Sequence, residues 1–150
     1  RRQRQMCIRD RYDISRTIEK VLRPKVWLRG GGYLIIQPTE ALIAIDVNTG
    51  KAISKKKDVE KTFLKVNMEA VEEIARQLRL RNLSGMILID FIDMKSKDDE
   101  KELLQVMQHY LNGDSKKAVA VDITKLGIME ITRKKEKNPI FRQISIDILK

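Results

Sequence analysis

The sequence predicts an α/β fold in which a mixed β-sheet is flanked by helices and begins with an N-terminal hairpin. Short apolar segments of strand length alternate with longer segments whose apolar residues recur at helical spacing. A triplet of glycines, residues 30–32, separates the first two strand-like segments, as a hairpin turn does. The 150 residues are enough for one domain with a core of its own.

The first half of the chain supplies a helix, the hairpin and one further strand. Apolar residues at helical spacing predict the helix, and Pro24 ends it. Residues 26–28 and 33–37 form the hairpin strands, and no helix follows the glycines to turn them into a phosphate cradle. Residues 41–47, ALIAIDV, form the next strand, and residues 48–50, NTG, are typical of a turn.

The second half alternates helices with strands. Residues 60–80 carry a one-sided apolar stripe, with arginines toward the end where they suit the helix dipole. Residues 86–92, MILIDFI, are almost continuously apolar, so we predict a strand buried on both faces. A second amphipathic helix follows at 98–111, and two more strands at 118–123 and 128–132. In all, the predicted helices cover residues 13–22, 60–80 and 98–111.

Charge and cysteine content limit the functional classes. The formal net charge of +10 suits a polyanionic partner such as nucleic acid. The lysine-rich segment at 51–58 is predicted to be an exposed loop, and a basic run at 133–137 could contribute to weak RNA binding. Cys7 is the one cysteine, so this sequence forms no internal disulfide and no cysteine-based zinc cluster. No apolar run approaches the roughly 20 residues that span a bilayer. No secretion signal is visible, so we expect a cytoplasmic protein.

The first eleven residues, RRQRQMCIRDR, differ from the rest of the chain. Their five arginines and one aspartate give 5 − 1 = +4 of the net charge of +10. Because they have neither strand alternation nor a helical stripe, we expect residues 1–11 to be a non-native arm that takes no part in the fold. The folded domain is then expected to cover residues 12–137, and residues 138–150 to lead out of it.

Two apolar strands each contain an aspartate near the carboxyl end, Asp46 and Asp90. Ligand sites in α/β sheets lie beyond these strand ends, and a buried carboxylate needs a partner. Two converging carboxylates suit Mg²⁺, which prefers one or two of them and keeps several waters. Alternation puts Asn48 on the same face as Asp46, where it could orient a water or a phosphate oxygen. Such a site could hydrolyse a phosphodiester.

Structural alternatives exist for these residues. Asp46 and Asn48 could form only a turn whose side chains cap backbone amides, and Asp90 could lie in an ion pair. Asp93 is a further candidate, but three residues beyond Asp90 it would face the other side of an extended strand. His109, the single histidine, falls late in a predicted helix, so no histidine-based mechanism is supported.

Other polar and aromatic residues also have two interpretations. Trp27 and Tyr33 could stack on nucleobases, although packing within the hairpin is the simpler role. The three arginines that end the helix at 60–80 or follow it, Arg76, Arg79 and Arg81, are expected to be solvated charge rather than specific contacts.

Several longer motifs follow one another from about residue 12 to residue 135. They are GGYLII at 31–36, PTEAL at 38–42, AIDVNTG at 44–50, NMEA at 67–70, EIARQLRLR at 73–81, GMILIDFIDM at 85–94 and LGIMEITRK at 126–134. Together they resemble the catalytic segment of the ribonuclease E/G family. The closing motif departs slightly, with Lys125-Leu126-Gly127 where many members have Arg-Phe-Gly.

The resemblance implies the deoxyribonuclease-I-like subdomain of an endoribonuclease that cleaves single-stranded RNA, leaving 5′-phosphate and 3′-hydroxyl ends. Asp46 and Asp90 match the residues that bind Mg²⁺ in the family, and Asn48 matches an assisting asparagine. The resemblance also implies ribosomal RNA processing, RNA decay, a homo-oligomer and an RNA-degradation complex.

In the family, an OB-type RNA-binding domain, a 5′-end sensor and zinc-link cysteines accompany this segment. The sequence contains none of them, so we expect a fragment of a larger enzyme. The alternative function is a non-catalytic RNA-binding or assembly module, because the fragment lacks domains that activity needs.

Overall fold

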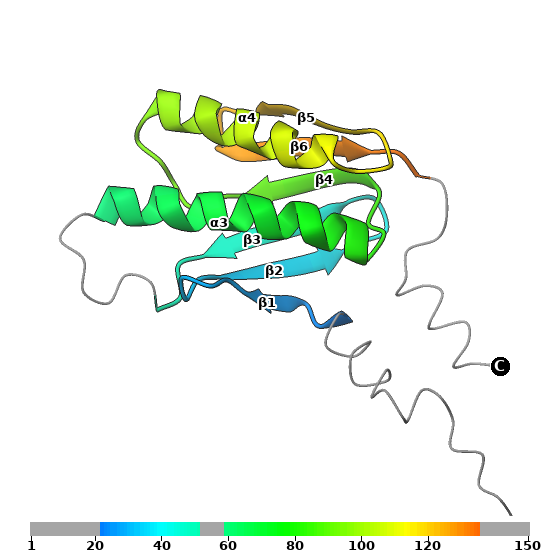
Figure 1. Cartoon of the computed structure of the whole chain (residues 1–150), viewed down its shortest axis with the longest axis horizontal. Coiled ribbons are helices and arrows are strands. Elements are labelled where there is room, and N and C mark those ends of the chain that lie inside the picture. The colour runs from blue at the N-terminus through cyan, green and yellow to red at the C-terminus, as the bar shows by residue number, and fades with distance from the viewer. Residues whose placement is uncertain (1–21, 52–58, 136–150) are drawn as a thin grey trace, which may run out of the picture.

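The computed structural model describes residues 22–51 and 59–135 of the chain. Within these ranges the chain forms a six-stranded mixed sheet with two long helices on one of its faces (Figure 1), which confirms the predicted α/β class and the hairpin. The strands are β1 (Lys25–Trp27), β2 (Tyr33–Pro38), β3 (Ile43–Asn48), β4 (Gly85–Asp90), β5 (Ala118–Ile123) and β6 (Ile128–Arg133), and the helices are α3 (Val59–Leu80) and α4 (Lys97–Asn112).

Parts of the sequence-based prediction fall outside the described residues. These are the arm at 1–11, all of the first predicted helix except Leu22, most of the lysine-rich loop and the extension at 138–150. Neither described helix has an apolar stretch long enough to cross a membrane.

The sheet has the strand order β1-β2-β3-β4-β6-β5. Strands β3 and β4 are parallel, and every other neighbouring pair in this sheet is antiparallel. A parallel pair needs a crossover connection, and α3 provides it. The carboxyl ends of β3 and β4 therefore meet at the same edge of the sheet.

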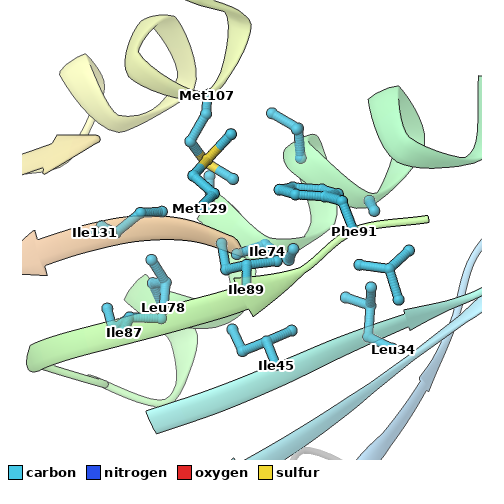
Figure 2. Packing of buried hydrophobic residues seen from close by; sticks show 14 of the residues in the cluster. Leu34, Ile45, Ile74, Leu78, Ile87, Ile89, Phe91, Met107, Met129 and Ile131 are labelled. Atoms are coloured by element: carbon cyan, nitrogen blue, oxygen red, sulfur yellow. The ribbon is translucent and has the colours of Figure 1, made fainter. Parts of the chain in front are cut away.

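The core lies between the sheet and the two helices. Alternate residues of the strands point toward α3 and α4, where their side chains interdigitate with Ile74 and Leu78 of α3 and Met107 of α4 (Figure 2). Each such aliphatic side chain contributes roughly 1.5–3 kcal/mol when it is removed from water. The strand residues labelled in Figure 2 that are at most 2% exposed are Leu34, Ile45, Ile87, Ile89, Met129 and Ile131.

The prediction that the strand at 86–92 is buried on both faces was wrong. Strand β4 ends at Asp90, and its residues alternate: Ile87 and Ile89 are fully buried, whereas Met86 is 47% exposed and Leu88 is half-buried. The reason is that α3 and α4 both cover the same face of the sheet (Figure 1). An apolar run does not show which of its two faces a helix covers.

The glycine triplet forms the hairpin turn, as predicted. Leu28 N donates to Gly32 O at 2.9 Å, and Gly31 N donates to Leu28 O at 3.2 Å. The turn after β3 packs directly against it, since Lys51 N donates to Gly31 O at 3.1 Å. Gly50 has a positive φ of 54°, and a Cβ there would collide with the carbonyl oxygen of Gly31.

We expect Gly50→Ala to lower the free energy of unfolding by roughly 1–3 kcal/mol, because the new Cβ is strained by the positive φ and has no room. The matched control is Gly113→Ala at the end of α4, where φ is −77° and the nearest heavy atom would lie 3.7 Å away. This variant should change stability by no more than about 0.5 kcal/mol. Urea unfolding measures the free energy of unfolding of both variants. If both lose the same amount, the turn after β3 is not tightly packed against the glycine turn of the hairpin.

Candidate metal centre on the open face of the sheet

The side of the sheet turned away from α3 and α4, which we call the open face, carries the side chains that alternate with the core residues. Its central positions are Tyr33, Asp46, Asn48, Leu88, Asp90 and Glu130. All of these are exposed or half-buried, so a ligand can reach them in the described part of the chain.

The structure brings Asp46 and Asp90 together at the centre of this face. They are direct partners in the parallel register of β3 and β4, and neighbouring strands lie about 4.8 Å apart. Both residues are exposed. The sequence-based premise that each carboxylate is buried was therefore wrong, because the face that carries them has no helix over it.

Asn48 lies on the same face, as the alternation predicted. Its Nδ2 donates a hydrogen bond of 2.7 Å to Oδ2 of Asp46. This contact joins two side chains, so it differs from the backbone cap expected if the segment were only a turn. Asn48 therefore fixes the orientation of the Asp46 carboxylate and places an amide oxygen, another hard ligand, near the pair.

The two carboxylates have no cationic partner among the described residues. Neither Asp46 nor Asp90 forms an ion pair with a lysine or arginine there, which argues against the ion-pair interpretation of Asp90. Like charges directly opposite on neighbouring strands destabilise a sheet. A divalent cation between them would remove this repulsion.

The ligand set favours a hard, weakly chelated ion. Within the two described ranges, no group of three or more histidine, cysteine or acidic side chains could hold a metal. Zinc sites need three or four protein ligands, whereas Mg²⁺ accepts one or two carboxylates and completes its shell with water. Asp46 and Asp90 thus fit Mg²⁺ better than zinc.

A residue that the sequence analysis missed positions the end of β4. Asn67 of α3 is fully buried, its Nδ2 donates to Ile92 O at 2.8 Å, and its Oδ1 accepts from Ile92 N at 3.1 Å. Ile92 is two residues beyond Asp90, so this amide fixes the backbone that leaves the candidate site. A polar residue beside the apolar stripe of the helix was the signal that could have revealed it.

Asp93 and His109 were two further residues considered from the sequence. Asp93 was predicted to face the other side of an extended strand, but β4 ends at Asp90, so Asp93 lies beyond the strand. It lines a cavity with Met94 and Phe63. His109 is exposed in the last turn of α4, as expected.

Two arginines are buried: Arg81, which was predicted to be solvated, and Arg133, which belongs to the basic run at 133–137. Arg133 is 4% exposed and pairs with Asp114, with Nε 2.7 Å from Oδ2. Arg81 is 5% exposed, and its guanidinium donates to Gln77 Oε1 at 2.6 Å and to Arg23 O at 2.7 Å. Burial lowers the pKa of Arg81, and the charge of Glu73 offsets this only in part. Neither arginine is available to contact RNA.

Comparison with known proteins identifies the family. A family model described as the Ribonuclease E/G family matches residues 1–136. The chain belongs to the ribonuclease E/G family. It is similar to Ribonuclease E of Nostoc sp., with 43% identity over 130 residues, which are 87% of this chain and 19% of that protein.

Two further members of the ribonuclease E/G family show the same relation. Ribonuclease G of Salmonella typhimurium is 41% identical over 131 residues, covering 87% of this chain and 27% of that protein. The Ribonuclease E/G-like protein of Pyropia yezoensis is 40% identical over 141 residues, covering 94% of this chain and 28% of that protein. The chain thus spans about a fifth to just over a quarter of the length of these curated relatives.

Proposed function

We propose that this chain is the catalytic core of an endoribonuclease that hydrolyses phosphodiester bonds of single-stranded RNA with Mg²⁺ held by Asp46 and Asp90. The observation that carries the proposal is the direct cross-strand pairing of these two exposed carboxylates, in a chain of the ribonuclease E/G family. The expected products have 5′-phosphate and 3′-hydroxyl ends. The net charge of +10 suits a polyanionic substrate.

Each residue of the candidate centre has a separate task. Asp46 and Asp90 would hold the cation, and Asn48 keeps the Asp46 carboxylate oriented through its 2.7 Å hydrogen bond. When bound, Mg²⁺ would stabilise charge on the phosphoryl oxygens and lower the pKa of an attacking water. Asn67 acts through the backbone at Ile92 and so is a positioning residue.

The cellular role in this proposal is the one that the resemblance to the ribonuclease E/G family implies. We extend to this chain a part in ribosomal RNA processing and RNA decay in the cytoplasm. The complete protein would act as a homo-oligomer and as a member of an RNA-degradation complex.

The metal assignment can be tested on this chain by thermal unfolding with and without MgCl₂. A ligand that binds only the folded state stabilises it, by about 2.7 kcal/mol at 100 times its dissociation constant. We therefore expect Mg²⁺ to raise the melting temperature of the wild type but not of Asp46→Asn or Asp90→Asn.

The matched control for this measurement is Asp122→Asn. Asp122 is an exposed aspartate of the same face, opposite Glu130, but β6 separates its strand from β4. This variant should respond to Mg²⁺ as the wild type does. An equal response of Asp90→Asn, or no response of the wild type, would overturn the assignment.

A further inference from the structure

We propose that Trp27, Tyr33 and Lys25 form a stacking site for a nucleobase of single-stranded RNA, on the open face beside Asp46 and Asp90. This inference rests on the proposed function for the identity of the ligand. It adds a binding site that lies outside the candidate metal centre.

The two aromatic rings pack against each other, and Trp27 is largely exposed. Trp27 and Tyr33 are direct partners in the hairpin, with ring centroids 5.3 Å apart and planes at 63°. Packing within the hairpin therefore explains why the rings touch. It does not explain why Trp27 remains 60% exposed, since an indole of this size is normally largely buried.

A lysine adds positive charge to the aromatic pair. Nζ of Lys25 lies 4.2 Å from the centroid of the Trp27 ring and 3.8 Å from that of the Tyr33 ring. Aromatic rings can stack on any of the nucleobases, so such binding depends little on the RNA sequence, and an adjacent cation attracts the backbone phosphate. Together, these groups have the chemistry of a single-strand binding site.

The register places this site close to the carboxylate pair. Trp27, Tyr33 and Asn48 form one row across β1, β2 and β3, and Lys25 lies in the next row with Asp46 and Asp90. Trp27 and Asn48 are two strand spacings apart, or roughly 10 Å. An RNA strand whose phosphate lies at the carboxylates can therefore place a nearby base on Trp27.

The charges on the open face favour one path for the RNA across the sheet. On the side of β6 and β5, Glu130 and Asp122 are opposite one another and would repel phosphates. On the side of β1, Lys25 attracts them. The RNA is therefore expected to run from the carboxylate pair toward β1.

The hairpin is fixed relative to the carboxylates. Gly30 N donates to Glu69 Oε2 of α3 at 2.8 Å, which anchors the turn between β1 and β2. A Cβ on Gly32 would lie 2.8 Å from Asn48 O, so the hairpin turn contacts the end of β3 directly. Because both contacts are close, the stacking site is held at a set distance from the metal site.

Trp27 is the only tryptophan in the chain, so tryptophan fluorescence, excited at a wavelength that tyrosine does not absorb, reports on this site alone. We would titrate the chain with a short oligouridylate in low salt and EDTA, and in parallel with an abasic oligomer of the same length. The oligouridylate should quench Trp27, whereas the abasic oligomer should bind without quenching. Fluorescence anisotropy of labelled oligomers measures binding independently.

Variants separate stacking from charge. Trp27→Ala should weaken binding of the oligouridylate roughly 5- to 100-fold, because stacking on an aromatic ring is lost. Lys25→Gln should reduce the salt dependence of binding by about one phosphate contact. Leu126→Ala, which shortens a side chain that is 83% exposed, is the control and should bind like the wild type.

Two outcomes would overturn the stacking site: failure of the wild type to bind the oligouridylate, or saturation measured by anisotropy without a change in Trp27 fluorescence. The second result is also expected if another part of the complete protein, rather than RNA, normally covers this face. The wild-type titration needs no folded variant, so a Trp27→Ala chain that fails to fold does not block the test. Asp46→Asn and Asp90→Asn should keep full quenching, which separates failure of the stacking site from failure of the metal site.

Discussion

Replacing Asp90 or Asp46 with asparagine is expected to abolish RNA cleavage and to leave RNA binding largely intact. Asparagine keeps the shape of the side chain but removes the charge that would hold the cation. A catalytic metal contributes several kcal/mol to the transition state, so the expected loss of rate is at least about 10³-fold. In the proposed binding mode, affinity depends on basic and aromatic groups elsewhere on the surface, which these substitutions leave unchanged.

We expect a cleavage assay to need the parts of the relatives that this chain does not span. Positioning contributes roughly 7–11 kcal/mol to such reactions, and this chain spans 27% of the Ribonuclease G relatives. We therefore expect the chain by itself to cleave RNA very slowly or not at all. The test is to replace the matching segment of Ribonuclease G of Escherichia coli with this chain and to follow cleavage of a 5′-monophosphorylated oligoribonucleotide.

Asp122→Asn is again the control, because it removes a carboxylate from the same face at a distance from the pair. It should cleave at the rate of the unsubstituted chimaera. Wild-type rates in Asp46→Asn or Asp90→Asn would refute the metal assignment. A folded chimaera that binds RNA but does not cleave would favour the alternative of a non-catalytic RNA-binding module.

The sequence predicted the elements of the described fold because their patterns are local. The amphipathic stripe located α3 to within a residue, and the ends of β5 were predicted without error. Helix α4 extends one residue further at each end. It begins earlier because its N-cap, Ser96, which accepts from Asp99 N at 3.3 Å, was not recognised. The pairing of Asp46 with Asp90 also followed from local information, because both lie near the carboxyl ends of apolar strands that a helical crossover joins.

The sequence did not predict which face of the sheet is covered or which polar residues are buried. Both depend on partners that are distant along the chain. Asn67 bonds to a residue 25 positions away, and Arg81 to one 58 positions away. The spacing of apolar residues along the sequence does not predict such pairs. As a result, Asp46 and Asp90 were expected to be buried and Arg81 to be exposed, and the structure shows the reverse. Arg76 and Arg79 are exposed, as predicted.

The contact between Arg133 and Asp114 is the clearest example of a distant pair. The two side chains are 3% and 1% exposed, and the guanidinium binds both carboxylate oxygens, at 2.7 and 3.2 Å. Arg133 also donates to Leu83 O at 2.8 Å. The pair thus joins the end of β6, the turn after α4 and the turn before β4.

The same pair should make stability depend on pH. Burial acts to raise the pKa of Asp114, but hydrogen bonds from Arg133 and Lys116 N, with the charges of Arg133 and Arg79, outweigh it and hold the pKa below its ordinary value. A carboxyl with a lowered pKa in the folded state stabilises the fold above its unfolded pKa, near 4, and loses this contribution as the pH falls further. The wild type should therefore lose stability below about pH 4, and Asp114→Asn should lose less.

Asp114→Ala is expected to lower the free energy of unfolding at neutral pH by about 3–5 kcal/mol, because it leaves the buried charge of Arg133 without a partner. The control is Asp98→Ala, whose partner Lys101 is 3.8 Å away and whose side chain is 93% exposed. That variant should change stability by no more than about 0.5 kcal/mol. The double variant Asp114→Leu with Arg133→Met should recover much of the loss, since apolar residues can replace a buried pair. If the double variant is as unstable as Asp114→Ala, packing around Asp114 rather than the unpaired charge is the cause.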